Sequence, residues 1–406
     1  MHQPDMNSTD TLLLTTSDEQ NGESNSAESI AALISNQAGP ILPVGGRTKS
    51  ALSASSPGCT LLDMRGHRGI VSYDPSEFLI SAKAGTPLAE IQAVLDEQRQ
   101  YLPFDPLFVS QAATLGGTVA SGLSGAGRLL YGSLRDFVME VQLIDGLGKI
   151  VRGGGKVVKN AAGFDLPKLV VGSYGRLGVL TEVTLKVFPR PPANATLQVA
   201  VSNVKGAIAA VQSLMAQPLP ISALDLQFDR AGAVEMLARF SAPNDSLAEV
   251  LRRAAEACGL TGQAVREASQ EQQIWLDRAA AVEKHTAGGS RILVRMATTL
   301  PAFAELAPAL LAVAGDDAEL HCTGGGSVAW LSLADASPIL RIDQLLASHK
   351  IPAIVISAPD MINVDNSENE SNAGLRPLGD RTWLSIARRI QLAMDPQERF
   401  AAYVSP

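Results

Sequence analysis

The chain has 406 residues, of which 46% are hydrophobic and 18% are charged, and its formal net charge is −8. This length predicts two or three domains with at least one sizeable core. The acidic balance argues against nucleic acid as a partner, because neutralising phosphates requires a basic surface. The three cysteines form no CxxC pair, which excludes an iron–sulfur cluster or zinc knuckle held by this chain alone.

No signal peptide and no run of about 18–20 apolar residues is visible in the sequence. The most apolar run, "PAFAELAPALLAVAG" (301–315), carries Glu305 and Pro308 and predicts a packed helix. Sparse, unpaired cysteines fit a reducing compartment. We therefore expect a cytoplasmic protein, with peripheral association at the inner face of the cell membrane as an open alternative.

In chain order, the polar residues 1–28 predict a disordered leader. "ESIAALISNQAG" predicts a helix that ends at Gly39, and "ILPV" a short strand. "FLISAKAG" predicts a strand that leads into a helix with Thr86 as N-cap and Pro87 at the first position. "FVMEVQLIDGLGKIV" predicts two strands around an Asp-Gly turn, and "VLTEVTLKV" predicts a further strand.

The proline-rich stretch "PRPPAN" (189–194) predicts the main domain boundary, with a first domain over 29–190 and a second over 191–406. In the second domain, strand-like runs ("TLQVAVS", "ALDLQF", "RILVRMA", "SVAWLSL", "IPAIVIS") alternate with helical ones (206–215, 246–258, 302–314, 382–394). This pattern predicts an α+β domain with helices on one face of an antiparallel sheet. The polar stretch 363–374 predicts a loop.

Three glycine-rich segments lie in the first domain: "PVGGRTKS" (43–50), "AATLGGTVASGLSGAGRLLYGSLRDFV" (112–138) and "KNAAGFDLPKLVVGSYGRLGVLTE" (159–182). Glycine permits positive φ and lets a ligand approach the backbone, and successive free amides can bind phosphate oxygens. Ordinary turns or close backbone packing are the alternative explanations. Residues 149–190 include eight Lys and Arg but only two acidic residues. This excess of positive charge suits either an anion site or a solvated basic surface.

The order P-x-G-G-x-[ST], T-x-G-G-x-[VI]-[AS]-[ST], Y-G-x-x-R-D and K-N-x-x-G-[YF]-D-L-x-K-L resembles the vanillyl-alcohol-oxidase (PCMH) type of FAD-binding domain over about residues 29–190. Longer phrases, such as "GSLRDFVMEVQLIDGLGKIVRGGGKVVKNAAGFDL", are similar to the FAD-binding E subunits of bacterial glycolate oxidase complexes. The resemblance implies a two-lobed FAD-binding domain followed by a smaller, cap-like α+β domain with an antiparallel sheet.

What the resemblance implies for the cofactor is specific. The first loop would wrap the FAD diphosphate through backbone amides, the second would reach the diphosphate and the flavin edge, and two later segments would flank the flavin or the adenine. Some relatives attach FAD through a histidine in the first loop, where this chain has Arg47, so we expect non-covalent FAD. The implied cofactor-binding residues are Val44, Gly45, Gly46, Arg47, Thr48, Ser50, Thr114, Gly116, Gly117, Ser121, Gly122, Gly163, Gly178 and Val179.

Catalytic residues cannot be assigned from the sequence. The histidine-rich motif of catalytic relatives is missing, and the five histidines are His2, His67, His285, His321 and His349. His285 is the best candidate base, although a surface helix end explains it more simply. Arg291 and Arg295 could clamp a carboxylate or could face solvent. We predict no metal site.

The C-terminal "MDPQERFAAYVSP" also departs from the family's D-P-x-x-x-F-N-P-G-[RK] pattern. With the missing histidine motif, this favours an accessory flavoprotein that acts with a catalytic FAD subunit and an iron–sulfur subunit on a small 2-hydroxy acid, glycolate. Two alternatives stay open: a stand-alone FAD-dependent 2-hydroxy-acid dehydrogenase of the D-lactate type, and a scaffold that kept the fold without flavin.

Overall fold

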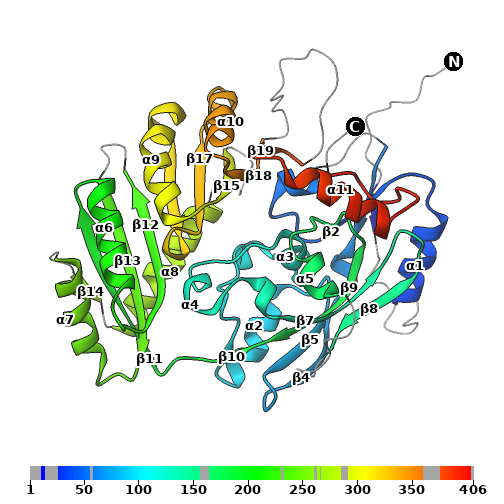
Figure 1. Ribbon diagram of the computed structural model, residues 1–406. Coiled ribbons are helices and arrows are strands. Elements are labelled where there is room, and N and C mark those ends of the chain that lie inside the picture. The colour runs from blue at the N-terminus through cyan, green and yellow to red at the C-terminus, as the bar shows by residue number, and fades with distance from the viewer. Residues whose placement is uncertain are drawn as a thin grey trace.

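The computed structural model describes residues 11–13, 26–54, 58–155, 164–229, 233–259, 263–265, 267–284, 291–359 and 375–403 (Figure 1). The first lobe is a parallel three-stranded sheet in the order β1-β3-β2, with β1 (Thr11–Leu13), β3 (Thr60–Asp63) and β2 (Ile41–Val44). Helix α1 (Ala27–Asn36) packs on it through Ile30 and Ile34. The expected disordered leader through residue 28 is therefore wrong for β1 and for the start of α1.

The second lobe is an antiparallel five-stranded sheet in the order β4-β5-β9-β7-β8. Its strands are β4 (Ile70–Asp74), β5 (Leu79–Lys83), β9 (Val179–Lys186), β7 (Val138–Ile144) and β8 (Ile150–Gly154). Its helices are α2 (Leu88–Glu97), α3 (Leu115–Ser121), α4 (Arg128–Tyr131) and α5 (Leu166–Val170). A short ladder joins β6 (Gln100–Tyr101) to β10 (Phe188–Pro189).

Helix α2 begins differently from the prediction. Its N-cap is Pro87, which offers no side-chain oxygen, rather than Thr86. The Thr86 hydroxyl instead accepts a hydrogen bond from the Gly69 amide at 2.9 Å and donates one to the Gly69 carbonyl at 3.2 Å. The predicted apolar face of the helix is confirmed, because Leu88, Ile91 and Leu95 are all buried.

The rest of the chain builds a nine-stranded antiparallel sheet in the order β14-β11-β13-β12-β16-β17-β15-β18-β19. The strands are β11 (Ala193–Val201), β12 (Ile221–Phe228), β13 (Val234–Ala242), β14 (Gln263–Val265), β15 (Ile292–Ala297), β16 (Glu319–Thr323), β17 (Val328–Leu333), β18 (Pro352–Ser357) and β19 (Pro377–Gly379). The five predicted strands are present, while β13, β14 and β19 were not predicted.

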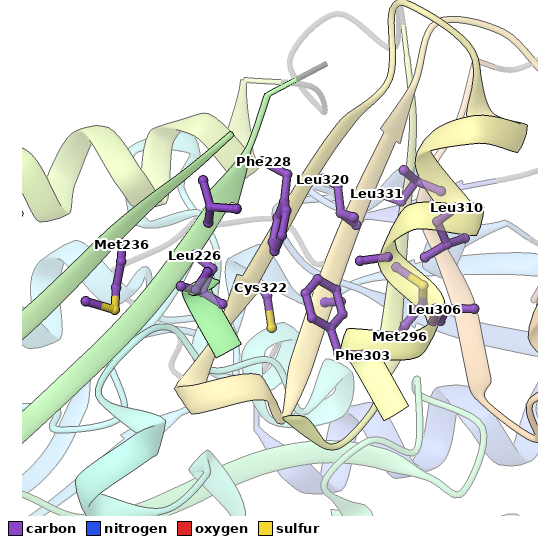
Figure 2. Packing of buried hydrophobic residues seen from close by; sticks show 14 of the residues in the cluster. Leu226, Phe228, Met236, Met296, Phe303, Leu306, Leu310, Leu320, Cys322 and Leu331 are labelled. Carbon is purple, nitrogen blue, oxygen red and sulfur yellow. The ribbon is translucent and has the colours of Figure 1, made fainter. Parts of the chain in front are cut away.

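One face of this sheet carries the helices α6 (Val204–Met215), α7 (Leu247–Cys258), α9 (Leu300–Ala314) and α10 (Ile339–Ser348) (Figure 1). Figure 2 shows Phe303 of α9 packed against the sheet near Phe228, with their ring centroids 5.2 Å apart. Residues on the other face, such as Trp330 and Ile354, pack with the first domain, where α8 (Ala268–Glu283) also lies.

The C-terminal segment returns to the first domain. Helix α11 (Trp383–Met394), drawn in red, lies near β2 (Figure 1), and Phe400 forms a parallel bridge with Ile41. The Gln391 side chain donates to the carbonyls of Arg176 and Ala401. The expected range 191–406 for the second domain therefore does not hold for its last residues, and the boundary near Arg190 remains our proposal.

Candidate functional site

The loop after β2 has the backbone of an anion site. Arg47 adopts the left-handed region with φ +50°. The amides of Gly46, Arg47 and Thr48 donate no hydrogen bond to any other residue that the structure describes. Unpaired amides beside a left-handed residue form the concave arrangement that binds phosphate or carboxylate oxygens.

The second glycine-rich segment forms helix α3. Thr114 caps it, with its hydroxyl accepting from the Gly117 amide at 3.3 Å, and Gly122 ends it at φ +65°. The Gly116 amide donates to the Ala84 carbonyl at 2.7 Å, which fixes the start of the helix against the strand β5 and its following turn. The helix N-terminus is thereby held in a defined position beside the first loop.

The two loops meet at one cavity of about 60 Å³, which is too small for a whole dinucleotide. It is lined by Pro43, Val44, Gly45, Gly46, Arg47, Thr48, Lys49, Leu52, Ser53, Thr114, Gly117, Ala120, Ser121, Tyr174 and Gly175. Eight of the predicted cofactor residues are therefore brought together, from segments about seventy residues apart. No histidine is among these described lining residues.

The glycines around the cavity serve two different purposes. A Cβ on Gly45 would lie 2.1 Å from the Thr114 hydroxyl oxygen, and a Cβ on Gly46 would lie 2.3 Å from the Ala112 carbonyl oxygen. These two glycines allow the loops to touch, which is the close-packing explanation. A Cβ on Gly117 would meet only the Thr114 hydroxyl, at 3.1 Å, so this position leaves room on the cavity wall.

Five predicted cofactor residues lie away from the cavity lining. The Ser50 hydroxyl bonds to Ser357 and Ala358 of the second domain, and Gly116 packs against Ala84. Gly122 approaches Gly172, while Gly178 approaches the Ile144 carbonyl. Val179, which begins β9, is buried in the sheet. Gly163 lies outside the described residues. Their contact with a cofactor stays a prediction.

A buried arginine ties the cavity walls together. Arg176 is fully buried, and its guanidinium donates to the carbonyls of Leu52, Ala54, Tyr174 and Ala402. Burial lowers its pKa to about 10. Because these carbonyls belong to the first loop region, the third glycine-rich segment and the C-terminal segment, Arg176 fixes all three relative to one another.

Lys49 and Tyr174 are cavity residues that the sequence did not reveal. The Lys49 ammonium, only 7% exposed, donates to Thr48 Oγ1 at 2.7 Å and lies 4.6 Å from the centre of the Phe108 ring. Burial lowers its pKa to about 8, while Glu283 of α8 acts in the opposite direction. A lysine three residues after a Gly-Gly turn gave no signal that it would turn inward.

A larger cavity, of about 760 Å³, lies between the first domain and the face of the nine-stranded sheet that does not carry α6, α7, α9 and α10. Its first-domain wall includes residues 99–107 and 125–127, and its other wall is formed by β11, β12, β13, β16 and α8. The sequence had offered no catalytic residue in the second domain. Single charged residues inside apolar strands, such as Asp225 in "ALDLQF", were the signal that could have found this cavity.

Two groups of charged side chains in the larger cavity are paired. Arg239 contacts Glu271 at 3.2 Å and Asp105 at 3.4 Å, and its guanidinium lies 4.4 Å from the Trp275 ring centre. Asp225 accepts from Thr323 Oγ1 at 2.6 Å and lies 3.0 Å from His321 Nε2.

Of the other candidate residues, His67, His349 and Arg291 bond to neighbouring protein groups. His67 is buried, with Nε2 3.0 Å from the Thr181 carbonyl, and His349 bonds the Leu345 carbonyl at the end of α10. Arg291 donates to Ser332 Oγ at 2.8 Å. His285 lies outside the described ranges. Among the residues that the structure describes, no group of three or more His, Cys, Asp or Glu could hold a metal ion, and no helix is long and apolar enough to cross a bilayer.

Residues 23–154 match a family model described as an FAD binding domain. This part of the chain is similar to the FAD-binding domain family and is named the FAD-binding domain after it. The match covers the first loop and α3, so the cavity between them lies in the FAD-binding domain.

Curated relatives of the FAD-binding domain are subunits and dehydrogenases. Glycolate oxidase subunit GlcE of Escherichia coli K12 is 48% identical over 192 residues, which is 47% of this chain and 54% of that protein. D-lactate dehydrogenase of Anaerostipes hadrus is 31% identical over 207 residues (50% and 43%), and glycolate oxidase subunit GlcD of Bacillus subtilis is 28% identical over 214 residues (52% and 45%). The chain spans about half the length of these relatives.

The fold extends beyond the FAD-binding domain. A solved structure of alkyldihydroxyacetonephosphate synthase superposes on 93% of this chain and 74% of that chain with a TM-score of 0.67 at 14% identity. The expected fold, a two-lobed PCMH-type domain followed by an α+β domain with an antiparallel sheet, is confirmed. At this identity the match speaks for architecture alone.

Proposed function

We propose that this chain binds FAD non-covalently, with the diphosphate at the cavity between the first loop and α3. The free amides of Gly46, Arg47 and Thr48 would hold the phosphate oxygens, and Gly117 would leave space beside them. The absence of histidine among the described lining residues supports a cofactor held without a covalent bond to histidine. Arg176 would act indirectly, by fixing the walls of the cavity.

We further propose that the chain is the FAD-binding subunit of a glycolate-oxidising complex. The observation that carries this proposal is the 48% identity to GlcE over 192 residues. Oxidation of glycolate to glyoxylate removes two electrons and two protons, and bound FAD supplies a two-electron acceptor. Electrons would then leave through a partner iron–sulfur subunit, beside a catalytic FAD subunit. We propose a cytoplasmic location, with peripheral contact to the inner membrane face.

A stand-alone dehydrogenase for a D-lactate-like 2-hydroxy acid is the second candidate. It is supported by the similarity to D-lactate dehydrogenase and by the 760 Å³ cavity beside the FAD-binding domain, which has room for a small substrate. The third alternative, a scaffold without flavin, would make both cavities irrelevant to chemistry. Flavin content and activity of the isolated chain separate the three.

The test is to purify the chain alone and together with candidate partner subunits. Flavin is quantified by absorbance before and after acid precipitation, and glycolate oxidation is followed with a dye acceptor. We expect about one FAD per chain, released into the acid supernatant, and activity only in the assembled complex. Omitting this chain from the co-expression should remove most of that activity.

Each alternative gives a different result. Flavin that stays with the precipitated protein would contradict non-covalent binding. Robust oxidation of glycolate or D-lactate by the chain alone would support the stand-alone enzyme. A colourless protein whose omission leaves the activity intact would leave only the scaffold.

A further inference from the structure

Two arginine side chains near the domain junction have no partner among the residues that the structure describes. Arg295 lies in β15 and Arg128 begins α4, and both are partly buried. Neither guanidinium makes a hydrogen bond or an ion pair with any residue in the described part of the chain. Asp136, the acidic group that acts on Arg128 through its charge, instead accepts from the Ser133 amide at 2.8 Å.

The fold brings these two side chains to the same place. Arg295 lies two residues after Leu293 and therefore on the same face of the sheet, the face that packs against the first domain. Its cross-strand neighbours are Trp330 of β17 and Ile354 of β18. Arg128 lies over the turn Gly324–Gly326 that enters β17: its Cδ is 3.6 Å from where a Cβ of Gly324 would be. Burial lowers the pKa of both groups, and the positive charge of Arg128 adds to the effect at Arg295.

Both arginines lie beside residues of the larger cavity. Arg295 acts through its charge on Tyr174, which lines the cavity between the first loop and α3. Its cross-strand neighbour Trp330 lines the larger cavity, as does Gly127, the residue before Arg128. Each arginine thus has a neighbour in the wall of the larger cavity, the space large enough for a substrate, although neither arginine is among the lining residues of the two cavities.

An unpaired, partly buried cation is costly, and two adjacent ones repel each other. Three other enclosed arginines are compensated: Arg239 by Glu271 and Asp105, Arg278 by Glu235, and Arg176 by four carbonyls. Two guanidinium groups without such compensation are suited to an oxyanion, which forms charge-assisted hydrogen bonds with them.

We propose that Arg128 and Arg295 together bind the carboxylate of a small 2-hydroxy acid beside the larger cavity. This rests on the proposed function for the identity of the acid, whereas the binding of a carboxylate rests on the two side chains alone. The two arginines are binding residues in this proposal, and no proton or hydride step is assigned to them.

The experiment uses the full chain as purified, with oxalate and glycolate as probes in titration calorimetry. Arg295→Met and Arg128→Met remove one charge each at similar side-chain volume, and Arg295→Lys keeps the charge without the planar fork. Arg291→Met is the matched control, because Arg291 directly precedes the same strand but is hydrogen-bonded to Ser332. Flavin content and melting temperature are measured on each protein.

We expect each Met variant to bind oxalate about 10- to 150-fold more weakly, the range for a lost hydrogen bond to a charged group. Arg295→Lys should fall between wild type and Arg295→Met, while Arg291→Met should bind as wild type does. Flavin content should not change. The ligand-free Met variants should melt at the same or a higher temperature than wild type, because an unpaired buried charge is removed.

Several results would overturn the proposal. Wild type that binds neither probe, or Met variants that bind oxalate as tightly as wild type, would rule out the carboxylate site. Loss of flavin in the Arg variants would assign the arginines to the cofactor instead, and a lower melting temperature of the ligand-free Met variants would indicate a structural role. If wild type lacks flavin but binds oxalate through both arginines, the carboxylate site stands and the proposed function fails.

Discussion

The two domains hold their polar groups in different ways. In the FAD-binding domain the cavity is made by backbone: the amides of residues 46–48, the capped start of α3 and glycines that let the two loops touch. In the second domain the polar groups are side chains that project from the interior of strands, such as Asp225, Arg239 and Arg295.

This difference explains why one cavity was predicted and the other was not. A backbone site leaves a local sequence pattern, because positive φ and close approach demand glycine at fixed positions. A side-chain site on a sheet depends on which strands are neighbours and on register, and neither can be read from one strand's sequence. The two arginines of the proposed carboxylate site are 167 positions apart in the chain.

The largest expected effect is in the second domain, for Arg239→Met. This variant leaves the buried carboxylate of Glu271, as well as Asp105, without a cationic partner, which should cost about 3–5 kcal/mol of stability. Denaturant unfolding should show the loss, and Glu271→Gln combined with Arg239→Met should recover part of it. An unchanged midpoint for Arg239→Met would mean that solvent stabilises the two carboxylates as well as Arg239 does. The contrast with Arg295→Met, for which we expect no loss, tests the distinction between paired and unpaired arginines.

The next effect concerns Lys49 in the wall of the flavin cavity. Its pKa falls from an ordinary value of 10.5 to about 8 on folding, so the unfolded chain binds more protons between these values and stability rises as pH increases. Below pH 8 the lysine is charged in both the folded and the unfolded chain, and its burial then lowers the free energy of unfolding by about 3 kcal/mol. This value already includes the opposing charge of Glu283, whose own pKa burial raises.

Lys49→Met should therefore be more stable than wild type near pH 7, and the difference should shrink as pH rises from 8 to 10.5. Melting temperatures of both proteins across this range provide the measurement. A constant difference would show that Lys49 is solvated and titrates as an ordinary lysine.

Much of the fold follows from local patterns. The apolar face of α2, the β7–β8 hairpin around Asp145, and four of the second-domain helices lie where periodicity predicts them. Strand β13 was missed because "VEMLARFSA" carries charged and small residues that weaken the strand pattern. The return of the C-terminal segment to β2 was missed because it depends on contacts across more than 350 residues.

For the cavity in the FAD-binding domain, the glycine motifs located the loops but not the purpose of each residue. Gly45 and Gly46 are needed for contact between the loops, while Ser50 turns away from the cavity toward the second domain. A glycine motif shows that glycine is required at a position, but ligand contact and close packing can both require it. Only the neighbours in space separate ligand contact from packing.

Gly117→Ala separates these demands for flavin. Its new Cβ meets only the Thr114 hydroxyl and gains helix propensity, so the unfolding free energy should stay within about 1 kcal/mol of wild type. Flavin affinity should fall about tenfold or more, because the methyl group occupies the cavity wall. Gly46→Ala is the contrasting variant, since a Cβ 2.3 Å from the Ala112 carbonyl should damage both stability and flavin binding. Wild-type flavin affinity in Gly117→Ala would place the cofactor elsewhere.

The smallest expected effect is at Ser50, a predicted cofactor residue that instead joins the two domains. Its hydroxyl lies 3.0 Å from Ser357 Oγ and accepts from the Ala358 amide at 3.2 Å. Ser50→Ala and Ser357→Ala should each cost about 1 kcal/mol, and the double variant should cost less than their sum because they share one hydrogen bond. Flavin content should stay at the wild-type level in all three. If Ser50→Ala loses flavin while Ser357→Ala does not, the hydroxyl serves the cofactor, and the first loop binds by side chain as well as by backbone.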